Sequence, residues 1–255
     1  MPGMMLRLVL CLAAGVGAVP AAAQEVPADA RDGWKFSVTS YGWLSGLEGD
    51  VGSIPGLPAS PVDLSFGDIL DNLDYAFMVI ATARNGPWAV YFDGTAVKTT
   101  SNENIGGALV DNVEVQSRTE TLTLAVGHVL AEAPLGNVDA YLGARFWWLD
   151  NTFTVDTALG SRRTAAKANW TDPIIGVSGR YRVADRWTLF GSAEIGGFGV
   201  GADFEWSVLA GARYEVSDLW GLSFGWRHLE VDYDEDGIVF DVTQTGPLIG
   251  ATFRF

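Results

Sequence analysis

Apolar and polar side chains alternate one by one over most of the chain after residue 33. In the run Val138–Trp148 the even positions are apolar, whereas Asp139 and Arg145 fall on the odd positions. The runs 187–195 and 206–214 have the same period of two. This period is typical of a strand with one apolar and one polar face.

The alternation predicts ten strands, most of them 10 or more residues long. Strands of soluble proteins are usually about 5–6 residues long, whereas a tilted strand that crosses a bilayer needs about 9–11. The lengths therefore favour strands that span a membrane. The predicted strands lie near residues 34–43, 73–84, 88–98, 113–130, 138–155, 168–182, 187–198, 203–216, 220–233 and 239–255.

The connections between these strands alternate between short turns and longer polar segments. Short turns on one rim and long loops on the other are typical of outer-membrane barrels. We therefore predict an all-β fold over residues 34–255, a closed antiparallel transmembrane β-barrel of ten strands, with eight or twelve strands as alternatives. The predicted short turns are 85–87, 131–137, 184–186 and 217–219, and the long connections lie near 44–72, 99–112 and 156–167.

Aromatic residues recur where strands meet the predicted periplasmic rim. Four tryptophans each open a strand directly after a short turn or the N-terminal leader, and a phenylalanine closes the chain. Amphipathic rings are most stable at the membrane–water interface, so this recurrence predicts an aromatic girdle. The predicted interface residues are Trp34, Trp88, Trp187, Trp220 and Phe255.

The first residues follow another pattern. Residues 1–7 carry one positive charge, residues 8–19 are almost wholly apolar, and three alanines end at Ala23. We predict a cleaved signal peptide over 1–23 and a periplasmic leader over 24–33. No later stretch is apolar enough to predict a transmembrane helix.

Composition narrows the class of protein. The formal net charge of −15 argues against nucleic acid as a partner, because phosphates require basic residues. The single cysteine, Cys11, lies in the predicted signal peptide, so the mature chain has no disulfide framework. We expect the protein in the cell outer membrane, in contact with outer-membrane lipid, lipopolysaccharide and the barrel-assembly machinery.

The last strand, Pro247–Phe255, alternates apolar residues and ends in phenylalanine, which resembles the C-terminal signature of bacterial outer-membrane barrels. The segments Tyr41–Trp43, Val62–Asp68 and Leu73–Met78 resemble a group of proteobacterial outer-membrane proteins that are loosely similar to the OmpA- and OmpW-type small barrels. The resemblance implies fold and location, and no catalytic motif comes with it.

Charged residues within the predicted strands fall on the polar face and so point into the lumen. Facing lipid, each would cost several kcal/mol. Two interpretations stay open: an ionic network that fills a narrow barrel, or a charged ring that selects small solutes in a thin pore. The lumen-facing candidates are Asp93, Arg145, Arg180, Glu194, Arg213, Arg227 and Arg254.

An acidic segment resembles the start of a calcium loop. Asp232, Asp234 and Asp236 alternate with other residues and precede Gly237. Such carboxylates could bind a hard cation, but position twelve of the loop would be Thr243, which lacks a carboxylate. A plain hairpin turn ending in Asp-Gly is the main interpretation, so we expect no cofactor, with calcium as the alternative.

Two local features are predicted within and between strands. Residues 65–73 predict one or two helical turns with Ser65 as N-cap and Asp68 at N3, which would form an ordered extracellular loop or a plug in the barrel mouth. Pro173 and Pro247 interrupt predicted strands and suggest bulges near the extracellular ends.

The sequence predicts an integral outer-membrane protein, either structural or a narrow channel for small solutes. One alternative is a soluble periplasmic or secreted β-sandwich that binds a ligand. Another is an outer-membrane enzyme that modifies lipid. We expect no enzyme, because His128 and His228 both fall on the lipid-facing side and neither is followed by a serine two residues later.

Overall fold

A computed structural model describes residues 33–52, 58–104, 111–157 and 159–255. The chain divides into two units, Met1–Gly33 and Trp34–Phe255. The predicted signal peptide lies outside the described residues, as does the leader up to residue 32. All of the helices and strands among the described residues belong to the second unit.

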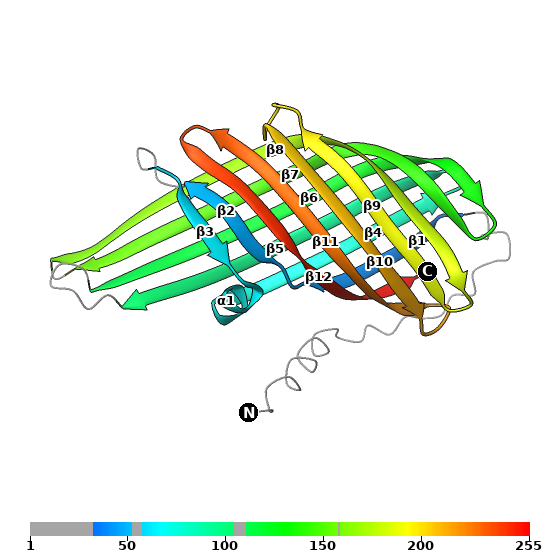
Figure 1. The fold of residues 1–255 in the computed structure, drawn as a ribbon, viewed down its shortest axis with the longest axis horizontal. Coiled ribbons are helices and arrows are strands. Elements are labelled where there is room, and N and C mark those ends of the chain that lie inside the picture. The colour runs from blue at the N-terminus through cyan, green and yellow to red at the C-terminus, as the bar shows by residue number, and fades with distance from the viewer. Residues whose placement is uncertain (1–32, 53–57, 105–110, 158) are drawn as a thin grey trace, which may run out of the picture. The chain divides into compact units, whose positions relative to one another are not determined.

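Ten antiparallel strands form one closed ring (Figure 1). Each strand pairs with the next around the ring, and β1 pairs with β12 to close it. The predicted ten-strand barrel is confirmed, and the two-sheet sandwich is not supported. Closure pairs the backbone groups around the ring up to the level of Ser40 and Val79, as a bilayer requires. The strands are β1 (Lys35–Trp43), β4 (Leu73–Asn85), β5 (Trp88–Asn104), β6 (Asn112–Ala133), β7 (Gly136–Thr157), β8 (Gly160–Ala184), β9 (Trp187–Gly197), β10 (Phe204–Glu215), β11 (Trp220–Glu235) and β12 (Ile238–Arg254).

Two further strands lie outside the ring, where the sequence predicted a loop over 44–72. Strand β2 (Gly46–Gly52) pairs with the upper part of β12, and β3 (Ser60–Leu64) pairs with β2. The prediction was wrong because β2 holds three glycines and two acidic residues, a composition that is depleted in strands. β12 therefore pairs with β2 over Val239–Thr245 and with β1 over Leu248–Arg254.

Helix α1 (Phe66–Asp71) follows β3 and has the predicted cap. The Ser65 hydroxyl accepts a hydrogen bond from the backbone N–H of Asp68, and the Asp68 side chain accepts one from the backbone N–H of Ser65. Hydrogen bonds from Ser65 hold the pKa of Asp68 below its usual range. Among the described residues, no helix has the length and apolar character needed to cross a membrane.

The strands differ in length around the ring. Strands β6, β7 and β8 have 22, 22 and 25 residues, whereas β9 and β10 have 11 and 12. Figure 1 shows β5–β8 running past the ends of β9–β12 at one end. The long loops predicted near 99–112 and 156–167 are therefore largely strand. Above the membrane both faces of a strand meet water, so alternation gives no signal there.

The two prolines do not mark bulges, contrary to the prediction. Register shifts occur instead at Leu73/Tyr75, Val129/Ala131 and Arg182/Ala184. Pro173 lies where the pairing of β8 with β9 ends, and Pro247 where β12 changes partner. A residue without an N–H is tolerated where a strand loses or changes its neighbour.

The outer surface of the barrel is apolar between two levels of aromatic rings. On the rim of short turns, Trp34, Trp88 and Trp187 are exposed, Trp220 is half-buried and Phe255 is exposed. At the other level Phe77, Trp148, Phe204 and Trp226 are exposed. On β7 the apolar band runs from Val138 to Trp148, which matches the length of about 9–11 residues that crosses a bilayer.

Candidate functional site

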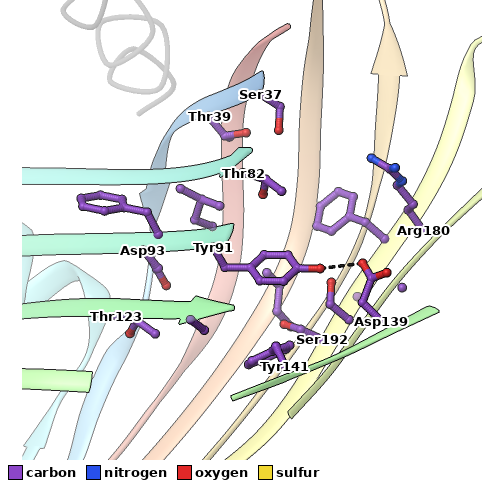
Figure 2. A pocket seen from close by; sticks show the side chains of 18 of the residues that line it. Ser37, Thr39, Thr82, Tyr91, Asp93, Thr123, Asp139, Tyr141, Arg180 and Ser192 are labelled. Atoms are coloured by element: carbon purple, nitrogen blue, oxygen red, sulfur yellow. Dashed lines mark hydrogen bonds between the residues drawn. The ribbon is translucent and has the colours of Figure 1, made fainter. Parts of the chain in front are cut away.

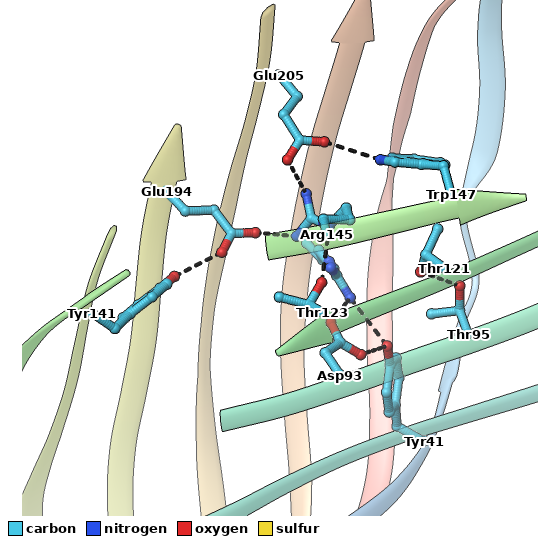
Figure 3. A network of polar contacts seen from close by, with 11 residues as sticks. Tyr41, Asp93, Thr95, Thr121, Thr123, Tyr141, Arg145, Trp147, Glu194 and Glu205 are labelled. Atoms are coloured by element: carbon cyan, nitrogen blue, oxygen red, sulfur yellow. Dashed lines mark hydrogen bonds and ion pairs between the residues drawn. The ribbon is translucent and has the colours of Figure 1, made fainter. Parts of the chain in front are cut away.

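A layer of buried charged side chains crosses the lumen between two cavities (Figure 3). Arg145 on β7 is 2% exposed and forms ion pairs with Glu194 on β9 and Glu205 on β10. The distance from Arg145 Nη1 to Glu205 Oε1 is 3.2 Å. Arg145 Nε also donates to Thr123 Oγ1 at 3.0 Å. These contacts join β7 to its neighbour β6 and to strands two and three positions further around the ring.

A second arginine in the layer has its own partners. Arg227 Nη1 on β11 lies 2.7 Å from Asp93 Oδ2 on β5 and donates to Tyr41 Oη on β1 at 3.0 Å. Tyr41 in turn donates to Asp93 Oδ1 at 2.8 Å. The Arg227 guanidinium also lies over the Trp43 ring, 5.0 Å from its centroid. Both arginines are thus held by several charge-assisted contacts. We call Tyr41, Asp93, Arg145, Glu194, Glu205 and Arg227 the ionic layer.

Aromatic rings pack directly above the ionic layer. Trp147 donates through Nε1 to Glu205 Oε2 at 3.2 Å and stacks on Trp170, with ring centroids 5.3 Å apart. Trp170 stacks in turn on Tyr233 at 3.9 Å, and Phe240 packs edge-on against Trp147. The rings exclude water from the charges below them, which strengthens the ion pairs.

An inward-folded turn also contributes to this region. Asp172 on β8 is fully buried, accepts from Trp170 Nε1 at 2.7 Å, and accepts from the backbone N–H of Ala202 at 2.7 Å. Ala202, also fully buried, belongs to the connection between β9 and β10. Gly201 and Ala202 of this connection thus pack beside Trp170 and Asp172, whereas Phe198–Val200 and Asp203 are exposed.

The lower cavity, on the side of the short turns, is polar and has a volume of about 210 Å³ (Figure 2). Asp139 is its best-bonded carboxylate: it pairs with Arg84, accepts from Tyr91 Oη at 2.6 Å and accepts from Asn137 Nδ2 at 2.9 Å. Arg180 donates through Nε to Asn137 Oδ1 at 2.6 Å. We call this cavity the lower chamber. Its charged lining residues are Arg84, Asp93, Asp139, Arg145, Arg180, Glu194, Arg213 and Arg227.

The upper cavity has a volume of about 420 Å³ and an apolar lining. Among the described residues that line it, Arg227 alone carries a charge, and that residue belongs to the floor. We call this cavity the upper chamber. Its apolar lining includes Trp43, Leu47, Val51, Val62, Leu64, Phe66, Ile69, Leu70, Leu73, Met78, Val97, Val115, Trp147, Phe153, Leu229 and Phe240.

The lumen-facing candidates divide into two groups in the structure. Six of them line the lower chamber: Asp93, Arg145, Arg180, Glu194, Arg213 and Arg227. Arg254 lies at the rim of short turns, where it pairs with Glu215 and donates to the Ser217 carbonyl oxygen at 3.4 Å.

Sequence reasoning missed Glu205 and Asp172, which complete the buried layer. Glu205 lies between Phe204 and Trp206 at the start of a predicted strand. Glu205 lies at an odd position of this strand, as do Ser207 and Arg213. Strict alternation would therefore have predicted that its side chain faces the lumen. The sequence gives no sign that Glu205 reaches Arg145 across the lumen.

The acidic segment forms a tight hairpin turn. Asp236 and Gly237 both have positive φ, 55° and 76°, as this type of turn requires. Asp232 and Asp234 are exposed and flank the buried Tyr233. Among the residues described, no group of three or more His, Asp or Glu side chains could hold a metal ion.

Both histidines pack against tryptophans. The His128 ring lies edge-on to Trp88 at 4.8 Å, and the His228 ring lies 4.4 Å from Trp206. His228 Nε2 is also 3.8 Å from Glu230 Oε2. Trp88 belongs to the aromatic level of the lower rim, so His128 has the surroundings of an interface residue.

No family model and no curated protein matches the chain. Among solved structures, the outer-membrane protease OmpT from Escherichia coli is similar, with a TM-score of 0.53 at 12% identity, over 88% of this chain and 98% of that one. The translocator domain of the autotransporter NalP from Neisseria meningitidis has a TM-score of 0.43 at 13% identity, over 88% of this chain and 89% of that one. A major outer membrane protein from Thermus thermophilus has a TM-score of 0.42 at 14% identity, over 87% of this chain and 99% of that one.

The match to OmpT concerns the fold alone, because so little of the sequence is shared. A closed antiparallel ring with an apolar outer band between two aromatic levels is stable only when lipid surrounds that band. The fold and this outer surface together make the chain an integral β-barrel protein of the bacterial outer membrane.

Proposed function

We propose that this barrel is closed to ions by the ionic layer and binds small apolar molecules in the upper chamber. The observation that carries the proposal is the contrast between the charged floor and the apolar walls of one cavity. The proposed role is binding and includes no catalytic step.

The closed state is supported by the pairing within the ionic layer. Asp93, Glu194 and Glu205 all contact Arg145 or Arg227, and both arginines are buried. To pass this level, a hydrated ion would have to separate at least one pair. Leaving one charge of a buried pair without its partner costs about 3–5 kcal/mol.

Apolar ligands are supported by the chemistry and size of the upper chamber. A lumen wall that contacts water is usually polar, because the interiors of porin-type barrels are water-filled. Ligand sites have volumes of roughly 300–1,000 Å³ and predominantly apolar walls, and the upper chamber fits both criteria at about 420 Å³. An apolar molecule would gain free energy by displacing water from these walls.

Binding can be measured with N-phenyl-1-naphthylamine, a probe whose fluorescence rises in apolar surroundings. The bound probe is excited by energy transfer from the tryptophans of the protein. We expect saturable binding to the refolded mature chain. Val97→Asp, in the wall of the upper chamber, should weaken it at least about tenfold by placing a charge there.

The matched control is Ser192→Asp, which adds the same charge to the lower chamber. It should leave probe binding unchanged. Equal loss of binding in both variants, or no loss in Val97→Asp, would contradict the proposal. The same preparations in a planar bilayer should give no conductance steps.

A narrow channel for small solutes is the second candidate. Arg227 lines both chambers, so one layer of side chains separates them. Displacement of that layer would join the chambers into one passage. Discrete, salt-dependent conductance steps from the unmodified chain would favour this candidate over a closed barrel.

A further inference from the structure

The pairing of strands around the ring is interrupted beside the upper chamber. Strand β1 pairs with β4 from Lys35↔Arg84 to Ser40↔Val79 and no further. Above that level the chain of β1 continues into β2, which pairs with β3 instead of β4. Among the described strands, none pairs with the edge of β4 between Leu73 and Met78 on this side.

The backbone at this edge has lost its ordinary partners. The Trp43 N–H, which would continue the β1–β4 ladder, donates to Met78 Sδ at 3.4 Å. A thioether is a weak acceptor compared with a carbonyl oxygen. The ladder has therefore ended and the two strands diverge.

The gap lies at the depth of the outer leaflet. Val79 is six positions above Asn85, at the lower rim, and Leu73 is twelve above it. With a rise of about 3.3 Å per residue and a tilt of about 40°, these positions lie about 15 Å and about 30 Å above the rim. The apolar band of such barrels is about 25 Å tall. The gap thus begins within the hydrocarbon and ends at the outer interface.

The lower part of the gap is bordered by apolar side chains, whereas Asp74 at its top pairs with Lys98, whose Nζ lies 3.1 Å from Asp74 Oδ2. Phe77, on the outer face of β4, is 63% exposed, and Leu64 at the end of β3 is 43% exposed. Behind them Phe66, Ile69 and Leu70 of α1 line the upper chamber. A path bordered by these side chains suits hydrocarbon and excludes ions.

We infer that this gap is a lateral portal through which an uncharged apolar molecule moves between the outer leaflet and the upper chamber. The inference rests on the proposed binding function and adds the route. The ligand class is set by the walls, which are mainly apolar and whose polar lining residues are, apart from Arg227 in the floor, uncharged serine, threonine, asparagine and glutamine. A molecule dissolved in the outer leaflet can then reach the chamber without crossing water.

The portal can be closed by a cross-link, because the mature chain is predicted to contain no cysteine. Continuing the register of Ser40↔Val79 by two residues brings Gly42 opposite Phe77, both on the outer face. A Cβ added at Gly42 meets nothing within 4 Å. The test pair is Gly42→Cys with Phe77→Cys, joined by oxidation or by a short bis-maleimide. Ser40→Cys with Val79→Cys is the control, since these residues already pair.

One set of vesicles is preloaded with N-phenyl-1-naphthylamine, and a second set contains the protein. The measurement is the rate at which the probe reaches the protein, followed in a stopped-flow instrument by energy transfer from tryptophan to the probe. The signal of Val97→Asp, which retains every tryptophan, is subtracted as background. We expect the cross-linked test pair to load at least about tenfold more slowly than its reduced form, with unchanged affinity at equilibrium. The control pair should load equally fast in both forms. Gly42→Trp, which places a ring at the gap, should also slow loading.

Each result separates the route from the binding function. Normal equilibrium binding with no slowing in either the cross-linked pair or Gly42→Trp overturns the portal and leaves the chamber intact. The cross-link could also slow loading by the same factor whether the probe comes from vesicles or from water. That result overturns the lateral route. Absence of saturable binding in the unmodified chain overturns the proposed function, and the portal with it.

Discussion

Seven strands of the ring line both the lower and the upper chamber, whereas β8–β10 line only the lower one and β2, β3 and α1 only the upper one, and the two chambers differ most in their charge. On β5, Tyr91 and Asp93 face the lower chamber, whereas Val97 faces the upper one. On β11, Ser223 lines the lower chamber and Leu229 the upper one. The lower chamber holds five arginines and three carboxylates, and the upper chamber has Arg227 as its one charged lining residue among those described.

The difference shows that facing the lumen does not by itself make a position polar. A lumen position below the ionic layer contacts water and other charges, so serine, threonine and arginine are suited there. Above the layer the same parity carries valine, leucine and methionine together with uncharged serine and threonine, and Arg227 is the one charged residue among the described lining residues. The ionic layer is therefore the boundary between two environments of one lumen, and substitutions on either side of it should have separate effects.

The largest effect is expected when the boundary itself is broken. Arg145→Ala leaves Glu194 and Glu205 buried without their cation. We expect a loss of about 3–5 kcal/mol in the free energy of unfolding, measured by urea titration of the folded barrel in detergent. Arg213→Ala is the control, because its partner Glu215 keeps Arg254 as a second cation, and it should lose less than Arg145→Ala. Equal losses would mean that the buried layer stabilises the barrel no more than this pair at the rim does.

Opening the boundary should join the chambers. In Arg145→Ala/Arg227→Ala both cations of the layer are absent, and the remaining carboxylates repel one another. We expect discrete cation-selective steps in a planar bilayer from this variant and no steps from the unmodified chain. Folding of the variant is checked by the shift of the unboiled protein on a gel. A folded and silent double variant would show that the aromatic rings above close the lumen without the charges.

A change confined to the lower chamber should leave the upper one untouched. Arg84→Ala removes the arginine partner of Asp139, whose Tyr91 and Asn137 hydrogen bonds remain. We expect a loss of about 1–3 kcal/mol in unfolding free energy together with unchanged affinity for N-phenyl-1-naphthylamine. Altered affinity in this variant would show that the two chambers are coupled through the layer.

The smallest effect is expected from the cap of α1. Ser65→Ala removes the hydroxyl that accepts from the backbone of Asp68, so the helix that lines the upper chamber should fray. We expect the affinity for the probe to fall by about twofold to fivefold. Ser60→Ala, in the same chamber but outside the cap, should change it less.

The same cap gives a dependence on pH. Hydrogen bonds from Ser65 lower the pKa of Asp68 in the folded state. The contribution of the carboxylate is therefore complete above its ordinary pKa and is lost as the pH falls through the lowered value. Probe affinity should fall in that acidic range in the unmodified chain and much less in Asp68→Asn. A parallel fall in both would assign the pH dependence to other groups.

Much of the barrel could be predicted from sequence because lipid imposes a regular pattern. Alternation located all ten strands of the ring, and the rim tryptophans located their lower ends. The missed elements lie where lipid imposes nothing: β2 and β3, and the upper parts of β5–β8, which extend above the apolar band. The partners within the ionic layer were also beyond reach, because the stagger of the closed ring decides that Arg145 meets Glu205 across the lumen.

The uneven pairing of β1 has a consequence for assembly. This strand is joined to β4 over six residues and to β12 over seven, whereas β6 and β7 pair along almost their whole length of 22 residues. A seam with so few hydrogen bonds forms last and separates first when cooperative units differ in stability. The β1–β4 seam is thus where we expect the closed ring to open first, and above Val79 β4 pairs only with β5 among the described strands.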